Sequence, residues 1–238
     1  MSPIAEEIVI PSRFNGPRES GNGGYTGGVL ASRLEGPVEV NLRSPVPLDE
    51  PLALERDEND SLSLQQGEAT IAEAHSIDGF DVPIPAAVAP DEARRAAENY
   101  RGLDDGMFCK CFVCGRARED SFEIFAGQVD GRELAATPWT PPAWSADATG
   151  AVRPEFVWAA LDCPTYFACH LEGELTLSML VRQRTELRAP IAAEQEHVVV
   201  AWPIERDGRK RLAGAAVLSA VGEPLAFTEV LLIEPRQS

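Results

Sequence analysis

Apolar and polar residues alternate over many short segments of this chain, and the alternating segments fall into two runs. A period of two residues is typical of β-strands with one buried face. The first run predicts a strand, a helix at 25–34 that ends near Gly36, and four more strands. The second run predicts strands, a helix that begins at Pro154, and four longer strands. The predicted strands cover 6–10, 38–42, 51–56, 61–65 and 69–74 in the first run, and 121–125, 133–137, 174–187, 197–204, 212–221 and 225–233 in the second.

The order of these elements indicates that the chain contains two copies of one unit. The tripeptide Glu-Arg-Asp at 55–57 recurs at 205–207, and the dipeptide Gly-Glu at 67–68 recurs at 222–223. Both echoes lie between extended segments and keep their order, as an internal duplication requires. We therefore expect an N-terminal domain at 1–82, a linker at 83–107 and a C-terminal domain at 108–238.

The linker is expected to connect the two copies. It opens with a Pro- and Ala-rich stretch, which is typical of a break between elements. A short exposed helix is predicted at 91–100, with Asp91 as its N-cap.

Composition is that of an ordinary globular protein, with one strong bias in charge. Hydrophobic residues make up 44% of the chain, charged residues 25%, and the net charge is −17. Nucleic acids and anionic membranes are therefore not expected as partners, because both require a basic surface. No segment approaches the roughly 20 apolar residues of a membrane span. The first residues carry neither a basic nor an apolar stretch, so we expect no secretory signal and a cytoplasmic protein.

Cysteine spacing raises the question of a metal site. The weak candidates are Cys109, Cys111 and Cys114, which form a C-x-C-x-x-C cluster among five cysteines. Thiolates at such spacing can share a zinc ion, and a fourth ligand would come from Cys163, Cys169 or His170. No second cysteine or histidine pair follows at a finger-like distance. Reduced, partly buried thiols are therefore the default expectation, and no metal is expected.

Two segments of the second run resemble thioesterase-like proteins of the hotdog superfamily. They are Cys-Phe-Val-Cys-Gly at 111–115 and Phe-Val-Trp-Ala-Ala-Leu-Asp-Cys-Pro at 156–164. The resemblance implies an α+β double hotdog, in which two copies of a helix wrapped by a curved antiparallel sheet pack as a pseudo-dimer. It also implies hydrolysis of an acyl thioester, carried by coenzyme A or by an acyl-carrier protein. No cofactor is expected beyond the coenzyme A of the substrate, and a homodimer of the whole chain is compatible with the resemblance.

The resemblance also places a site between the two copies. The helices of this superfamily often open with His-Gly-Gly or Asn-Gly-Gly, and the latter matches 22–24. Nine residues after Arg153, at the start of the second helix, lies Asp162, whereas nine residues after Asn22 lies Ala31. One copy thus keeps the helix-start glycines and the other keeps the acid. Hotdog sites lie across the dimer interface, so one working site and one degenerate site are expected.

The candidate catalytic residues are Asp162, Asn22, Gly23 and Gly24. Backbone N–H groups of Gly23 and Gly24 at a helix start could hold a developing oxyanion. The Asn22 amide could donate to the carbonyl or position water. Asp162 would act as a general base on water or attack directly. Its apolar neighbours should raise its pKa by desolvation.

Each of these residues also has a structural alternative. Asp162 could satisfy backbone groups freed by Pro164, which should kink the helix, and the glycines could serve close packing alone. The candidate substrate-binding residues are Glu155, Tyr25, Trp158, Arg206 and Arg209. The sequence favours a core role for the aromatic residues over acyl contacts, and solvated loop or edge-strand charges for the arginines. The three histidines, His75, His170 and His197, are expected to be structural.

Two other functions stay open at this stage. A hotdog hydratase or dehydratase is disfavoured, since such enzymes commonly place a histidine beside the acid and neither helix start has one. A non-catalytic protein that binds an acyl ligand or a partner chain is favoured by the loss of that histidine. The chain lacks a Gly-x-Ser-x-Gly elbow, a phosphate loop and a dinucleotide fingerprint, so those enzyme classes have little support.

Overall fold

The computed structural model describes residues 6–102, 106 and 108–236. Three α-helices are found within these residues: α1 (Gly23–Ala31), α2 (Pro90–Glu98) and α3 (Pro154–Ala168). The strands are β1 (Glu6–Val9), β2 (Val38–Leu42), β3 (Pro51–Arg56), β4 (Leu62–Gln66), β5 (Ala69–Ser76), β6 (Gly127–Gln128), β7 (Ala135–Trp139), β8 (Met179–Leu187), β9 (His197–Asp207), β10 (Lys210–Leu218) and β11 (Pro224–Ile233).

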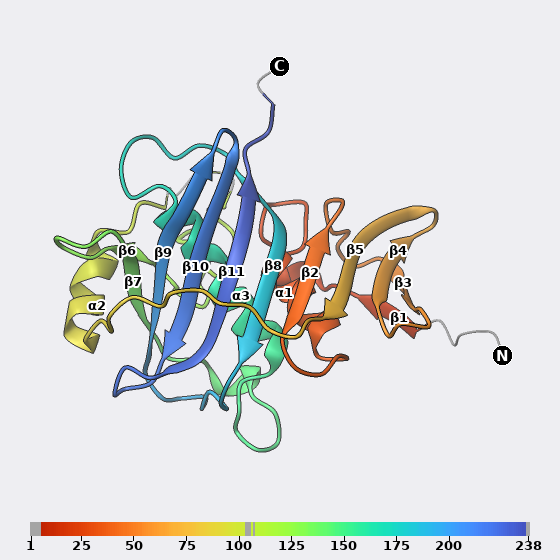
Figure 1. The fold of residues 1–238 in the computed structure, drawn as a ribbon, viewed down its shortest axis with the longest axis horizontal. Coiled ribbons are helices and arrows are strands. Elements are labelled where there is room, and N and C mark those ends of the chain that lie inside the picture. The colour runs from red at the N-terminus through yellow and green to blue at the C-terminus, as the bar shows by residue number, and fades with distance from the viewer. Residues whose placement is uncertain (1–5, 103–105, 107, 237–238) are drawn as a thin grey trace.

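All of these strands belong to one antiparallel sheet, and α1 and α3 pack together against one of its faces (Figure 1). The strand order is β1-β3-β4-β5-β2-β8-β11-β10-β9-β7-β6. Within it, β1-β3-β4-β5-β2 with α1 repeats as β7-β9-β10-β11-β8 with α3. The Glu-Arg-Asp echo lies at the ends of β3 and β9. The other echo places Gly67 and Gly222 in equivalent hairpins, both with positive φ (+59° and +85°). The internal duplication is therefore confirmed.

The two copies meet through β2 and β8, which pair antiparallel from Val38↔Thr185 to Asn41↔Arg182. This pairing makes the sheet continuous and removes one exposed edge from each copy, which is how natural sheets avoid unwanted pairing. On the helical side, α1 contacts α3 across the same junction. The expected α+β class and pseudo-dimer are both confirmed.

The connector between the copies is better packed than the sequence indicated. It crosses the outer face of the second half of the sheet (Figure 1), where Val82 and Val88 join a core cluster with Trp202 and Phe227. The expected short helix is present as α2, but it is exposed on one side only, because Ala93 and Ala96 are buried. Its N-cap is Ala89, and Asp91 lies inside the first turn. Of the expected ranges, 1–5, 103–105, 107 and 237–238 lie outside the described residues.

Several predicted limits shift: the strand predicted at 174–187 begins only at Met179, and the one predicted at 212–221 is β10, Lys210–Leu218. Two other elements differ more. The first helix begins at Gly23 and ends at Ala31, so its glycines are helical. Residues 121–125 form no strand. Phe122 and Ile124 are buried alternately, but their N–H groups donate to the carbonyls of Phe112 and Val113, and Glu123 adopts a φ of +54°. The alternation there reflects packing on the cysteine loop.

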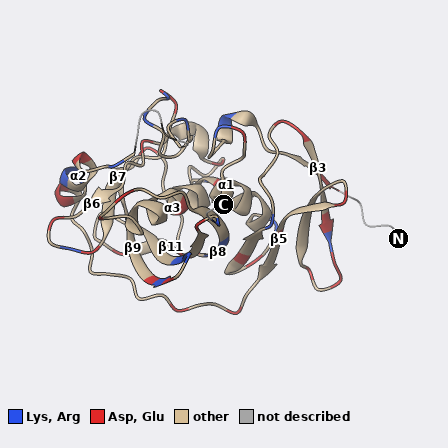
Figure 2. Cartoon of the chain, turned by 90° about the horizontal axis from the view of Figure 1, so that it is seen from above, with Lys and Arg blue, Asp and Glu red and all other residues tan. Residues whose placement is uncertain are grey.

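Charges lie mainly away from the helical pair (Figure 2). Helix α1 has no charged residue, and α3 has two, Glu155 and Asp162. Within the described residues, no helix combines the length and the apolar character that crossing a membrane would need.

Candidate active site

The first turn of α1 supplies backbone donors to the candidate site. Asn22 is the N-cap, and its Oδ1 accepts a hydrogen bond from the N–H of Tyr25 at 2.8 Å. The cap satisfies one of the donors that a helix start leaves unpaired. Gly23 and Gly24 follow as the first helical residues, at the positive end of the helix dipole.

Helices α1 and α3 cross so closely that glycine is required at the crossing. A Cβ atom on Gly24 would lie 2.6 Å from Cβ of Asp162 and 2.7 Å from the carbonyl oxygen of Trp158. On Gly28 it would lie 2.3 Å from Cα of Glu155. This approach brings the N–H of Gly24 within 3.1 Å of Oδ2 of Asp162. The absence of a side chain at Gly24 therefore allows both the close packing of the helices and the hydrogen bond to the Asp162 carboxyl group.

The Asp162 carboxyl group is buried, with 8% of the residue exposed. Burial raises its pKa to about 7. The N–H of Gly24 and the side chain of Asn22 oppose this rise, and the charge of Cys111 adds to it. A group with such a pKa can exchange a proton near neutral pH, as acid–base chemistry requires.

The role of Asp162 as a partner for backbone freed by Pro164 is not supported. Helix α3 continues through Pro164 to Ala168. Pro164 leaves the carbonyl of Ala160 without its helical donor, and no hydrogen bond from Asp162 to that carbonyl is found among the described residues. The carboxyl group of Asp162 instead accepts from α1.

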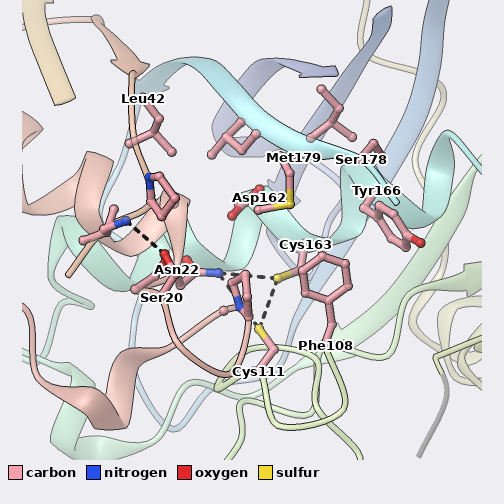
Figure 3. A pocket seen from close by; sticks show the side chains of 18 of the residues that line it. Ser20, Asn22, Leu42, Phe108, Cys111, Asp162, Cys163, Tyr166, Ser178 and Met179 are labelled. Atoms are coloured by element: carbon pink, nitrogen blue, oxygen red, sulfur yellow. Dashed lines mark hydrogen bonds between the residues drawn. The ribbon is translucent and has the colours of Figure 1, made fainter. Parts of the chain in front are cut away.

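A cavity of about 270 Å³ opens beside the Gly24–Asp162 contact (Figure 3). Asn22, Gly23 and Asp162 line it, so the structure brings together the acid of one copy and the helix start of the other. Its remaining walls are mostly apolar, and include Leu42, Val46, Phe108, Met179, Leu180 and Leu232.

Comparison with solved structures shows which fold holds this site. A protein of unknown function with a hot dog fold from Alicyclobacillus acidocaldarius superposes with a TM-score of 0.62, at 13% identity, over 98% of this chain and 93% of its own. A thioesterase-named protein from Novosphingobium aromaticivorans gives 0.63 at 12% identity, over 97% and 95%. The tesB protein of Mycobacterium avium subsp. paratuberculosis gives 0.56 at 12% identity, over 90% and 87%. The chain is a double hotdog.

These likenesses are of fold, because their sequence identities are low. No protein-family model matches the chain, and a search of curated proteins finds no match. The chemistry of this double hotdog must therefore be argued from its own residues.

The two helix starts of the double hotdog are equivalent in position but not in chemistry. Asn22 and Arg153 are the N-caps of α1 and α3. Counting from each cap, Ala31 is the counterpart of Asp162, and Glu155 is the counterpart of Gly24. The counterpart of the first site would therefore combine the start of α3 with Ala31 of α1. There the methyl group of Ala31 stands in place of the acid, and Pro154 in place of a glycine that has an N–H. This difference in residues keeps one equipped site and one degenerate site as the prediction.

The predicted substrate-binding residues lie elsewhere. Tyr25 and Trp158 are buried in the core, and Trp158 is 1% exposed. Glu155 lies 3.4 Å from Arg153 across an ion pair. Arg206 and Arg209 lie at the exposed hairpin between β9 and β10. None of the five lines the cavity, so their role in binding stays a prediction without geometric support.

Sequence reasoning missed two polar residues of the cavity, Ser178 and Arg43, because neither belongs to a recognisable motif. Ser178 is 3% exposed, and its Oγ has no hydrogen-bond partner among the described residues. Arg43 follows β2 directly and pairs with Glu73 at 2.7 Å. Only the position of Arg43, just after a predicted strand, could have indicated it. Ser178 enters from the segment before β8, which the sequence assigned to a longer strand.

The cysteine cluster differs from the one proposed from spacing. Cys111 and Cys114 lie beside Cys163 of α3, and all three line the cavity. Cys109 lies apart, and its Sγ accepts from Arg18 at 3.7 Å. Hydrogen bonds from the thiols of Cys114 and Cys163 hold the pKa of Cys111 well below its usual range. The same contacts raise the pKa of Cys114 and Cys163.

Proposed function

We propose that this double hotdog hydrolyses an acyl thioester in the cavity between its two copies. The observation that carries the proposal is the Gly24–Asp162 contact. It places a buried carboxyl group and the N-terminus of a helix at the wall of an apolar cavity. Thioester hydrolysis needs a base for water and donors for the oxyanion. Structural neighbours that bear thioesterase names support the same class.

The proposal gives the two glycines different roles. The N–H of Gly24 donates to Asp162 and so holds the carboxyl group in place. Gly23 lines the cavity at the first helical position, where the N–H has no partner within the helix. Gly23 is therefore the backbone donor proposed for the carbonyl oxygen of the substrate.

The proposed reaction begins with water held between Asp162 and the carbonyl carbon. Asp162 accepts a proton from the water as its oxygen bonds to that carbon, and the carbonyl oxygen gains negative charge near Gly23. The carbon–sulfur bond then breaks, and the leaving thiolate takes the proton from Asp162. The products are a carboxylic acid and a free thiol. The Ser178 hydroxyl, which is buried and unpaired, is placed to hold the water or the carbonyl.

The lining of the cavity suits both parts of such a substrate. Apolar walls suit the acyl group. Arg43, about half exposed and paired with Glu73, is placed for a phosphate of coenzyme A or of a carrier-protein arm. No histidine lines this cavity within the described residues, which favours hydrolysis over a hydratase that depends on one. His170 and His197 instead bond to the carbonyls of Tyr166 and Ala192.

Thiol release from acyl-CoA tests the proposal. A panel of short, aromatic and long acyl groups is assayed with the wild type, with Asp162→Asn and with Asp81→Asn. The amide keeps the size of Asp162 but cannot accept the proton, so turnover should fall by about 100-fold or more. Asp81 is exposed on the connector, and its variant should match the wild type.

Other outcomes separate the alternatives. Binding of acyl-CoA without thiol release, unchanged in Asp162→Asn, would indicate a non-catalytic acyl-binding protein. Consumption of enoyl thioesters without thiol release would indicate a hydratase. Full activity in Asp162→Asn would reject the proposed site.

A further inference from the structure

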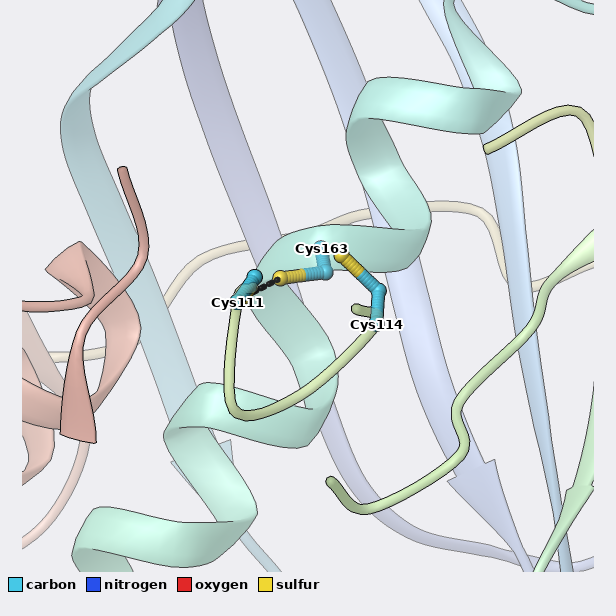
Figure 4. A group of neighbouring side chains, drawn as sticks. All are labelled: Cys111, Cys114 and Cys163. Atoms are coloured by element: carbon cyan, nitrogen blue, oxygen red, sulfur yellow. Dashed lines mark hydrogen bonds between the residues drawn. The ribbon is translucent and has the colours of Figure 1, made fainter. Parts of the chain in front are cut away.

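Three sulfur atoms lie next to the candidate active site, where two distant parts of the chain meet. The Sγ atoms of Cys111, Cys114 and Cys163 all lie within 4.8 Å of one another. Figure 4 shows Cys111 and Cys114 on one loop, both turned toward Cys163 on α3. The Cys111 and Cys163 sulfurs are 3.6 Å apart.

The loop holds its two sulfurs in a fixed turn. The N–H of Gly115 donates to the carbonyl of Cys111 at 2.8 Å, and the N–H of Val113 donates to its Sγ at 3.4 Å. A Cβ on Gly115 would lie 2.5 Å from the carbonyl oxygen of Cys111, so the turn requires glycine. Backbone N–H bonds to sulfur orient thiolates and stabilise their charge, as hydrogen bonds to the ligands of a metal ion do.

A second donor approaches from the other copy. The Nδ2 atom of Asn22 lies 3.7 Å from the Sγ of Cys163 and 4.0 Å from that of Cys111. Its amide is fixed by the cap bond to Tyr25. The sulfurs of Cys111 and Cys163 thus have N–H donors within reach, which suits thiolates better than neutral thiols.

We propose that Cys111, Cys114 and Cys163 bind one zinc ion as three thiolate ligands. Zinc–sulfur bonds of about 2.3 Å in a tetrahedron place two sulfurs about 3.8 Å apart. The observed 3.6 Å fits this edge, and the limit of 4.8 Å leaves only a small closure for the third sulfur. Soft thiolates select zinc over magnesium or calcium, and the common four-cysteine iron–sulfur clusters would lack one ligand among the described residues.

The fourth position of the ion faces the cavity. All three cysteines line that cavity, together with Asn22 and Asp162. Within the described part of the chain, no other cysteine, histidine or acid joins the group. A water molecule or a thiolate from a ligand would therefore complete the tetrahedron, as in zinc sites with three protein ligands. Each cysteine that is still a thiol releases its proton when zinc binds. This inference does not depend on the proposed hydrolysis.

Metal content and cobalt spectra test the site in the full chain. The purified, reduced protein should contain about one zinc per chain. After exchange for cobalt(II), it should show thiolate-to-cobalt charge-transfer bands and tetrahedral d–d bands. Cys111→Ser, Cys114→Ser and Cys163→Ser should each lose most of the bound metal and of the thiolate bands. Cys109→Ser and Cys169→Ser are matched controls and should keep both.

A second measurement covers the case in which a cluster variant does not fold. Wild-type protein is alkylated with N-ethylmaleimide, with and without a chelator, and the modified cysteines are mapped by mass spectrometry. Metal should protect Cys111, Cys114 and Cys163 together, and the chelator should remove that protection. Absence of stoichiometric metal, cobalt bands that persist without a cluster cysteine, or a disulfide between Cys111 and Cys163 would overturn the proposal. None of these results depends on enzymatic activity, so the proposed hydrolysis can fail separately.

Discussion

The two glycines at the start of α1, Gly23 and Gly24, have different surroundings. A methyl group on Gly23 would meet only the side-chain ends of Leu180 and Leu42, at 2.7 Å each. On Gly24 it would meet the backbone oxygen of Trp158 at 2.7 Å. Side-chain ends can rotate away, whereas a helix backbone must shift as a whole.

Alanine substitutions should therefore have different effects at these neighbouring positions. Gly24→Ala should lower the free energy of unfolding by about 1–3 kcal/mol, the usual cost of overpacking. Gly23→Ala should cost less than about 1 kcal/mol and raise KM for an acyl thioester, because its methyl group enters the cavity. Urea unfolding and steady-state kinetics check both. Equal losses of stability would contradict the helix crossing described here.

The sequence could predict the parts of the candidate site that belong to recognisable segments, but not the contacts between distant segments. Pro154 marked the second helix start by a local rule, whereas Asn22 was set against Arg153 only through the resemblance of its Asn-Gly-Gly segment to hotdog helix starts. That alignment set Asp162 against Ala31, and the structure brings Asp162 to Gly24. The approach of Cys163 to the cysteine loop depends on packing between segments about fifty residues apart, which no local pattern contains.

At the scale of elements, alternation predicted the succession of strands along the chain well and the limits of each strand less well. Strands β2 and β3 were predicted with the observed limits, because their polar faces are solvated. Strand β9 is buried on both faces only over 197–202, and it runs past its predicted end through exposed residues up to Asp207. Residues 121–125 alternate like a strand but pair with a loop. Periodicity thus reports burial, and a strand follows only where a partner strand is present.

The junction between the two copies carries a ladder of charges. Arg184 on β8 pairs with Glu39 on β2 at 2.5 Å and with Glu229 on β11 at 3.5 Å. Burial alone would raise the pKa of Glu39. Hydrogen bonds from Asn41 and Arg184, and the charge of Arg184, outweigh burial and lower this pKa from 4.5.

Removing Arg184 should weaken the junction in a pH-dependent way. Arg184→Met should cost about 1–2 kcal/mol at neutral pH, as expected for half-buried charged hydrogen bonds. A lowered pKa in the folded state adds stability above pH 4.5, and that stability is lost as the pH falls through the folded-state value. The difference from the wild type should therefore shrink in acid. Urea unfolding at neutral and acidic pH measures it, with the exposed Arg56→Met as control. A difference that does not change with pH would contradict the role of Glu39.

At the scale of the molecule, the two copies share one hydrophobic core. The cluster between the sheet and the helices includes Leu64 and Ile71 from the first copy and Trp158 and Val217 from the second. Backbone pairing between β2 and β8 and the crossing of α1 with α3 join the same two halves. We therefore expect the halves to unfold together.

Tryptophan fluorescence can test this coupling, because all four tryptophans lie between 139 and 202, in the second copy. Leu64→Ala removes a fully buried side chain from the first copy and should cost about 2–5 kcal/mol. If the copies are coupled, the urea midpoint seen by fluorescence should fall as far as the midpoint seen by far-ultraviolet circular dichroism. Val217→Ala, in the core of the second copy, is the matched control and should shift both probes together. A fluorescence midpoint that stays at the wild-type value in Leu64→Ala, with an earlier transition in circular dichroism alone, would show that each hotdog unfolds by itself.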